Sequence, residues 1–381
     1  MELFRHELYK VFCRKTVWIG FLFVIILVCF SSYMQASQLT KTYGNMSEYY
    51  NDFYKGKEGS VSDSLKQTAK SWIEKNGSNY QAKFVTNQTS VQENRKYEFY
   101  SEVLNPDYLK KNTQDDIAKL KNDVKTASSS YNIRKDNLQT AMLQNLQTPG
   151  LYFTLPLLNG LDFPEGLGFV VMGILVLLGI SPVFSDEYSS NTDSLILSSK
   201  KGRRSVVTAK ILSTTVYCIF VAAVVLLVYS SVQAAVLGIQ GFNAPLQLGF
   251  IRSPYSLTFG GYLALQAGLC AVACVFFGML VLLVSSVSSN VLIPFFICGF
   301  LFASSAFIKS MGTAVPQALT TFSDFSYTGL MRVKGLIESF KAYNVFGYPV
   351  LYLNLILIIY FIITAIVICF IYRIFHGRQV K

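Results

Sequence analysis

The sequence predicts an all-α integral membrane protein with six transmembrane helices and a large helical extracytoplasmic insert between helices 1 and 2. Of its 381 residues, 52% are hydrophobic and only 14% are charged, whereas charged residues make up about a quarter of an ordinary soluble domain. Several apolar runs reach the roughly 20 residues that a helix needs to cross a bilayer. These observations argue against an ordinary soluble globular protein.

Six apolar runs have the length of a transmembrane helix, and the last of them contains no charged residue. They are Val17–Ala36, Gly166–Phe184, Ala209–Val232, Leu257–Val284, Val291–Ile308 and Val350–Tyr372. We therefore expect residues 16–36 to form transmembrane helix 1. Residues 166–381 are expected to form helices 2–6, with a polar loop at residues 185–207 between helices 2 and 3.

The positions of lysine and arginine predict the orientation in the membrane. Basic residues gather before the first run, in the 185–207 loop and after the last run, whereas the loop 238–256 contains only Arg252. The loop 309–341 is more basic than this pattern favours. The positive-inside rule places both termini and the 185–207 loop in the cytoplasm and segment 37–165 outside the cell. The net charge of +11 is then a topology signal, and no nucleic acid partner is expected.

Residues 1–15 are predicted to form an amphipathic helix at the cytoplasmic membrane interface. The apolar side chains that share one side of a helical wheel, opposite Arg5, Tyr9 and Lys10, are Leu3, Phe4, Leu8, Val11 and Phe12. A helix of this kind lies flat in the interface. A solvated lead-in is the alternative, and the poor cleavage site "SSYMQAS" argues against a signal peptide.

The segment 37–165 has helix signals and nearly balanced charge. Ser60 or Ser62 is expected to cap a helix that stops at Asn76–Gly77, and a longer helix is expected to begin near Thr113. Apolar positions that recur every seven residues predict a helical hairpin or a short coiled coil; they are Ile117, Val124, Tyr131 and Leu138. Arg134 at an inner position weakens this seam. A spacer without a ligand of its own is the alternative.

The motifs of several enzyme classes do not occur in the sequence. There is no GxxxxGKS/T phosphate loop, so this chain is not expected to bind or hydrolyse ATP. GxSxG and HExxH are also missing. With two histidines in the chain, the seven cysteines do not assemble into a tetrahedral metal site. We expect no enzyme activity, no catalytic residue, no metal and no cofactor. Ion-coupled secondary transport is disfavoured because the apolar runs lack central charges.

Three small residues in the fourth apolar run stand at i, i+4 and i+8. They are Gly260, Ala264 and Gly268. Small residues at this spacing let two helices approach closely in a membrane. The strip serves either packing within the chain or a dimer face, and the spacing does not separate these.

The polar stretch from Phe184 to Lys210 has its acids first and its bases last. Asp186 and Glu187 suit the start of a short helix, and the bases after it suit its end. Leu195, Ile196 and Leu197 form an apolar patch that is too short to span a membrane. The pattern predicts a docking helix on the cytoplasmic surface. An ordinary basic loop that anchors two spans is the alternative.

The spacing of five residues in this stretch resembles the loop between spans two and three of ABC-2 type transporter permeases. The residues are Glu187, Thr192, Leu195, Arg203 and Lys210. The sequence departs from the family pattern at Asn191, where the family has glycine, and at Ser199, near the usual proline. Asparagine tolerates the left-handed conformation that glycine supplies. The amphipathic N-terminus, the six-span plan and the tail are similar to Gram-positive bacterial members.

This resemblance implies a permease subunit of an ATP-binding cassette transporter, usually an exporter, in the bacterial cytoplasmic membrane. Its partners would be a second permease copy or a related permease, and separate cassette ATPase subunits that bind ATP and Mg²⁺. The expected coupling-helix contacts with the ATPase are Glu187, Thr192, Leu195, Ile196 and Leu197, and the membrane-end anchors are Arg203, Arg204 and Lys210. Residues 2–15 would act as a connecting helix, and residues 309–348 as short broken helices. The rival hypothesis is a membrane receptor or scaffold that uses its extracytoplasmic segment without an ATPase. The transported substrate is left open.

Overall fold

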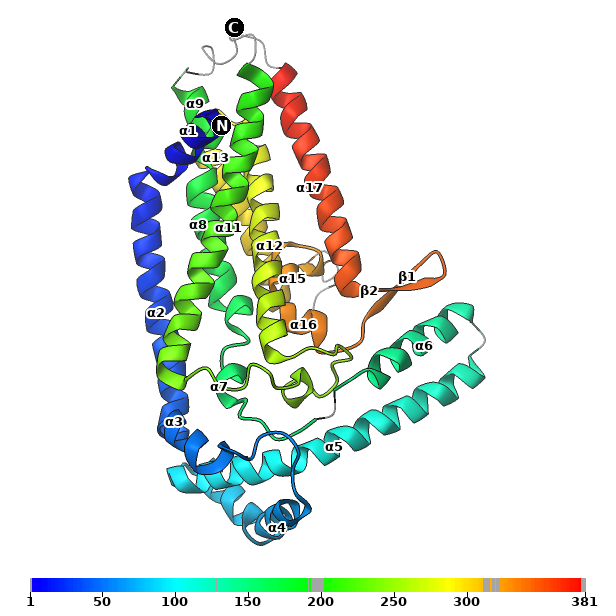
Figure 1. Cartoon of the computed structure of the whole chain (residues 1–381). Helices are drawn as coiled ribbons and strands as arrows, with labels where there is room; N and C mark the ends of the chain where they lie inside the picture. The colour runs from blue at the N-terminus through cyan, green and yellow to red at the C-terminus, as the bar shows by residue number, and fades with distance from the viewer. Residues whose placement is uncertain are drawn as a thin grey trace.

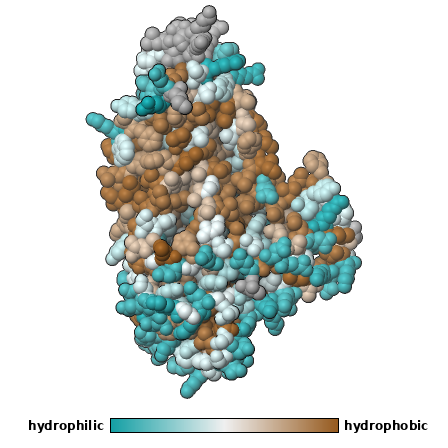
Figure 2. Space-filling model, in the orientation of Figure 1, coloured by the Kyte–Doolittle hydropathy of each residue, from teal (hydrophilic) through white to brown (hydrophobic). Residues whose placement is uncertain are grey.

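The computed structural model describes residues 2–127, 129–147, 149–190, 192, 202–310, 316, 319 and 323–377. It is a bundle of long helices with a smaller helical body attached at one end (Figure 1). A broad apolar band crosses the face of the bundle that Figure 2 shows, and polar surface lies at both ends of it. This is the architecture of an all-α membrane protein, because lipid-facing side chains must be apolar along the length that crosses the bilayer.

Five helices of the described chain are long and apolar enough to cross a membrane. They are α2 (Lys15–Tyr43), α8 (Leu167–Ile180) continued by α9 (Pro182–Ser189), α11 (Gly202–Leu237), α12 (Phe259–Val287) and α17 (Tyr352–Gly377). The run predicted as the fifth span forms α13 (Leu292–Ser310), whose described apolar stretch ends at Ser305 and is shorter than these. The sixth crossing therefore stays a prediction.

The two ends of the bundle differ in what they contain. The end that holds α1 (Glu2–Phe12), α9 and the last turn of α17 is called the terminal end, and the other is called the insert end (Figure 1). Between α13 and α17 come two short helices, α15 (Tyr327–Met331) and α16 (Val333–Ile337). These are the short helices expected in this region. The β-hairpin that follows, β1 (Ala342–Val345) and β2 (Tyr348–Leu351), is not predicted by the sequence.

Helix α11 packs against most of the other spans and lies in the centre of the bundle. Tyr217 on α11 is fully buried and donates a hydrogen bond to the Leu175 carbonyl oxygen of α8 at 2.7 Å. Gly179 makes this approach possible, because a Cβ atom there would lie 2.4 Å from the Tyr217 ring. The close contact joins α8 to α11 over the half of the bundle nearest the terminal end.

The insert, residues 37–165, has its own helices and its own aromatic core. Its elements are α3 (Met46–Tyr49), the π-helical turn η1 (Tyr50–Tyr54), α4 (Asp63–Val85), α5 (Val91–Thr126), α6 (Ser130–Gln144), α7 (Leu155–Leu158) and the 3-10 turn η2 (Phe163–Glu165). A further 3-10 turn, η3 (Leu246–Leu248), follows α11. Tyr49, Tyr54, Phe99 and Phe153 are buried together and form the centre of the insert core.

The helices of the insert agree with the sequence prediction in kind but not in their ends. Ser62 caps α4 as expected, yet the helix continues through Gly77 to Val85. The next helix begins at Val91, well before Thr113, and its N-cap Ser90 forms a capping box with Glu93. The seven-residue pattern is divided by the break between α5 and α6, which pack against each other as the predicted helical hairpin.

Candidate functional site

A buried ion cluster at the terminal end connects three helices that are separate in the sequence. Lys210 of α11 is fully buried, and its Nζ lies 2.7 Å from Glu187 Oε1 of α9 and 2.8 Å from Glu7 Oε2 of α1. The same ammonium donates to the Val183 carbonyl oxygen at 2.9 Å. The Phe184 ring centroid lies 5.1 Å from this nitrogen. An uncompensated charge in such a place is strongly destabilising, and here the two carboxylates balance the Lys210 ammonium.

Two further bases extend the cluster along α1. Lys10 Nζ lies 2.9 Å from Glu7 Oε1 and 3.0 Å from Glu187 Oε1, so it bridges the carboxylates that Lys210 also binds. Arg14 lies at the junction of α1 and α2 and contacts Asp186 Oδ2 at 3.3 Å. It also donates to the carbonyl oxygens of Pro182 and Gly179. Three carboxylates thus face three cationic groups.

The electrostatics of α1 favour the ionised states of Glu7 and Lys10. Burial alone would raise the pKa of the Glu7 carboxyl, but the ammonium groups of Lys210 and Lys10 outweigh burial and hold that pKa below its ordinary value. Burial alone would lower the pKa of Lys10, but its hydrogen bonds to Glu7 and Glu187 raise that pKa above its ordinary value. Opposite charges therefore compensate for desolvation on both partners.

A break between α8 and α9 places Glu187 in the cluster. Pro182 starts α9, and proline has no backbone N–H and disrupts a continuous helix. The backbone N–H groups of Phe184 and Ser185 donate instead to Ser285 Oγ of α12, at 3.1 and 3.2 Å. Ser285 in turn donates to the Ser181 carbonyl oxygen at 2.7 Å. The backbone groups at the break therefore find their hydrogen-bond partner on the neighbouring helix α12, and these bonds join α12 to the site.

Thr192 follows the end of α9, which has Ser190 as its C-cap, and closes the last turn of the helix. Its backbone N–H and its hydroxyl both donate to the Glu187 carbonyl oxygen, at 3.0 and 3.2 Å. A cavity of about 620 Å³ opens beside this turn, lined by Lys10, Arg14, Asp186, Glu187 and Thr192, among others. Glu187 Oε2 is buried and has no hydrogen-bond partner among the described residues. The cavity is thus lined by charged side chains and lies at the start of the predicted docking loop.

The structure brings together some of the residues singled out from the sequence. Glu187 and Lys210, predicted for different roles, are direct partners, and Thr192 closes the last turn of the same helix. Leu195, Ile196 and Leu197 lie outside the described residues, as do Asn191 and Ser199. The backbone of Arg203 belongs to α11, but its side chain is not described.

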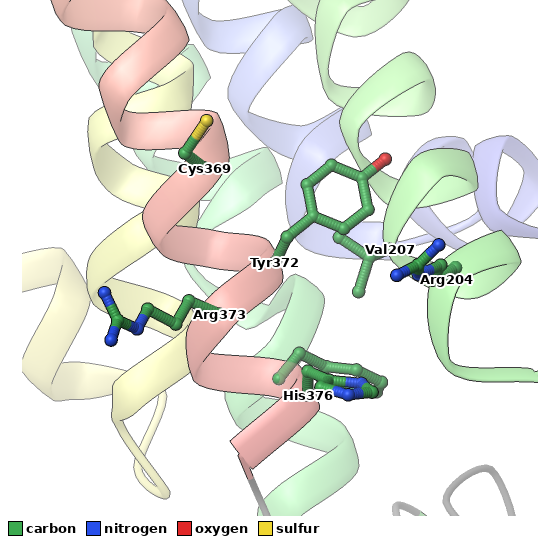
Figure 3. A pocket seen from close by; sticks show the side chains of 7 residues that line it. Arg204, Val207, Cys369, Tyr372, Arg373 and His376 are labelled. Carbon is green, nitrogen blue, oxygen red and sulfur yellow. The ribbon is translucent and has the colours of Figure 1, made fainter.

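Arg204 lies on the exposed side of α11, facing α17. It lines a cavity of about 270 Å³ together with Val207, Tyr372 and His376, among others. Figure 3 shows Tyr372 and His376 directed toward α11, whereas Arg373 points to the other side of α17. The Tyr372 hydroxyl lies 2.7 Å from Thr208 Oγ1. The cavity lies between the ends of α11 and α17, and its basic lining residues are Arg204, Arg373 and His376.

The strip of small residues on α12 lies mostly at the surface of the chain. A Cβ atom on Gly260 would lie 3.2 Å from the Phe242 carbonyl oxygen, whereas one on Gly268 would meet nothing within 4 Å. Ala264 and Gly268 are exposed. Close packing within the chain therefore involves only the first residue of the strip.

Two members of the site were not identified from the sequence. Glu7 occurs on a helix that was interpreted as amphipathic and lying in the interface, yet Glu7 and Val11 are its buried residues. A glutamate that interrupts an apolar face was the available signal. Ser285 ends an apolar run with nothing in its neighbourhood to mark it, and only the position of Pro182 hints that a partner is needed.

Comparison with known proteins agrees with this architecture. A family model described as "ABC-2 family transporter protein" matches residues 1–375. No curated protein matches the chain. Because the match extends over almost the whole chain, from α1 to the last turn of α17, the chain belongs to the ABC-2 family of multi-pass transporter permeases.

Proposed function

We propose that this chain is the permease subunit of an exporter that is powered by separate cassette ATPase subunits. In this proposal ATP and Mg²⁺ are bound by the ATPases, and this chain is not an enzyme and holds no cofactor. A second copy or a related permease completes the translocation path. The terminal end faces the cytoplasm, the insert lies outside the cell, and Arg203 and Arg204 anchor α11 at the cytoplasmic surface.

The observation that carries this proposal is the position of the ion cluster. The docking loop is flanked by α9 on one side and by α11 on the other, and Glu187 and Lys210 join these helices directly at 2.7 Å. Separating a buried ion pair leaves uncompensated charge and is strongly disfavoured. A force on the loop is therefore expected to move α9 and α11 together instead of pulling them apart.

Contacts around the cluster extend this connection to other spans. Glu7 and Lys10 add α1, and Ser285 adds α12 through the first turn of α9. Arg14 adds the start of α2. A loop that binds an ATPase would in this way be connected to four spans at one place, which is what a permease needs to convert ATPase movement into helix movement. A receptor that works through the insert would not require this arrangement at the opposite end.

Co-purification from native membranes tests the proposal. The tagged full-length chain should recover a cassette ATPase in stoichiometric amount, and an unrelated multi-pass protein with the same tag should not. Recovery of the chain in a folded state without any ATPase, both with and without added nucleotide, would favour the receptor or scaffold hypothesis instead.

A further inference from the structure

Phe346 has the highest exposed fraction of the large apolar side chains in the described chain, at 99%. It lies in the two-residue turn between β1 and β2, where Val345 pairs with Tyr348. Transfer of an aromatic ring from water to an apolar environment is favourable. A fully exposed ring therefore gains free energy if another apolar phase covers it.

The backbone of the turn makes a phenylalanine at this position unusual. Phe346 has φ +51° and Gly347 has φ +84°, and two successive left-handed residues are typical of a type I′ turn. Asparagine or glycine normally occupies the first position, because bulky residues rarely adopt positive φ. Asn344 Oδ1 stabilises the turn by accepting a hydrogen bond from the Gly347 N–H at 2.8 Å. Backbone strain that local structure does not require points to a function.

The hairpin lies next to the apolar band of the bundle. It is continuous with α17, since the Tyr352 N–H donates to the Lys341 carbonyl oxygen at 2.9 Å. Figure 1 shows the hairpin projecting sideways from the start of α17, away from the bundle, and Figure 2 shows an apolar tip level with the apolar band. Tyr343 and Tyr348 are also exposed, and tyrosine is enriched where membrane meets water.

Helix α6 of the insert holds the hairpin in this position. Arg134 donates to the Gly347 carbonyl oxygen at 3.1 Å, and its guanidinium lies 4.4 Å from the centroid of the Tyr348 ring. The Tyr131 hydroxyl donates to the Ala342 carbonyl oxygen at 3.2 Å. Arg134 is an exposed base beside the turn, and its guanidinium suits the phosphates of lipid headgroups.

We propose that the β1–β2 turn inserts Phe346 into the phospholipid leaflet at the insert end of the bundle, with α6 supporting the hairpin from the water side. The insert then has a further attachment to the membrane in addition to α2 and α8, the spans that precede and follow it. This attachment is independent of the ATPase coupling proposed above, so either proposal can fail alone.

Tryptophan fluorescence in proteoliposomes tests the insertion. The chain has two tryptophans, Trp18 and Trp72, and both are replaced by phenylalanine before Phe346→Trp is introduced. The probe is a phosphatidylcholine vesicle with or without brominated acyl chains. We expect a blue-shifted emission and quenching by bromine comparable with that of Phe361→Trp, a lipid-exposed position on α17. The control retains Trp72 on α4 of the insert, which should not be quenched.

Two outcomes would overturn the proposal. Emission typical of water with no quenching would show that the turn stays in solution. A blue-shifted emission without quenching would show that protein, such as a second copy of the chain, covers the ring. A second reporter, Tyr348→Trp, guards against a local effect of the Phe346→Trp substitution. Its fluorescence should be quenched by bromine when position 346 is the natural phenylalanine. At least half of that quenching should be lost when Phe346→Asn is added. Asparagine suits the turn, so the hairpin should persist. Equal quenching in both backgrounds would also contradict insertion of Phe346.

Discussion

Lys210 and Glu187 stand on either side of the polar loop in the sequence and form a 2.7 Å ion pair in the structure. Lys210 is fully buried, and the pair is completed by Glu7 from the first helix of the chain. The loop therefore begins and ends at one fixed point. This geometry explains why a chain with so few charges places acids at the start of the loop and a lysine in the helix that follows it.

Replacing Lys210 by methionine should destabilise the chain severely. The substitution leaves Glu7 and Glu187 buried with only the partly exposed Lys10 as partner, and breaking a buried ion pair from one side typically costs about 3–5 kcal/mol. Thermal unfolding of the purified chain in detergent measures the change. The matched control is Lys334→Met, which removes a part-exposed pair with Asp162 and should cost at most about 1 kcal/mol. Adding Glu7→Gln and Glu187→Gln to Lys210→Met should restore part of the loss. Equal stability of Lys210→Met and the natural chain would show that the cluster contributes nothing.

Removing the Ser285 hydroxyl should loosen the break between α8 and α9. Ser285→Ala leaves the N–H groups of Phe184 and Ser185 without the acceptor that they have in the structure. Leaving buried donors unsatisfied costs about 1–3 kcal/mol. Hydrogen exchange should increase at these two amides before any global unfolding. Ser304→Ala is the control, because that exposed hydroxyl donates to the Leu301 carbonyl oxygen of its own helix. Unchanged exchange at both amides would refute this role of Ser285.

The insert should lose stability as pH rises. Burial raises the pKa of Glu102 to about 8, and the neighbouring Glu98 adds to this rise, although the Tyr54 hydroxyl donates a hydrogen bond to the carboxylate. Tyr43, Tyr49 and Glu98 also face this region. Between the ordinary value of 4.5 and about 8, the folded insert keeps a proton that the unfolded chain has lost. Stability is therefore highest below this window and falls as pH rises through it.

Protease resistance of α4 and α5 in the full chain, compared at about pH 6 and about pH 8.5, measures this dependence. Glu102→Gln should flatten it. Asp107→Asn on the same helix removes an exposed pair with Lys66 and should leave it intact. A dependence that survives Glu102→Gln would assign it to another group.

Truncation of the apolar patch in the loop should weaken ATPase binding. Interfaces concentrate binding energy in a few buried anchors, so Leu195→Ala or Ile196→Ala is expected to cost about 1–3 kcal/mol of docking free energy. Titration of the purified ATPase onto each variant in nanodiscs measures the affinity. Membrane insertion should not change, because the patch is too short to span. Leu212→Ala, at an exposed position on α11, is the control for loss of a leucine elsewhere. Unaltered affinity after both loop truncations would argue against a coupling helix.

Five of the six predicted spans correspond to helices long and apolar enough to cross a membrane, because the physical cause of such a helix is local. An uninterrupted apolar run of sufficient length forms a membrane helix wherever it stands, and α12 and α17 begin and end within a few residues of the expected limits. The limits of α2 and α11 were underestimated, since both helices continue past the apolar run into polar residues. In α2 the added turns end at Tyr43, whose carbonyl oxygen accepts a hydrogen bond from the buried Arg95.

The insert shows where local signals compete. Asn76–Gly77 looks like a helix stop, but Gly77 is buried in a continuous α4. The Ser90–Glu93 capping box was present in the sequence and would have placed the start of α5 correctly. The ion cluster was beyond sequence reasoning, because Glu7, Glu187 and Lys210 meet only through the packing of α1, α9 and α11. The hairpin was missed because Phe346–Gly347 lacks the asparagine that usually marks a type I′ turn.

ATP hydrolysis by the reconstituted complex tests the central claim most directly, with Glu187→Gln as the decisive variant. Glutamine keeps the shape of the side chain but removes the charge that binds Lys210, whereas the apolar patch of the loop is unchanged. Glu187 is among the expected ATPase contacts, but it is only 9% exposed, so we expect the apolar patch to keep the ATPase bound. We expect the variant to retain the ATPase on the membrane and to lose most of the difference in hydrolysis rate between the complex and the isolated ATPase. Lys334→Met, at the other end of the bundle, should behave as the natural chain. If Glu187→Gln complexes retain both the ATPase and the full permease-dependent rate, the ion cluster does not couple the loop to the spans.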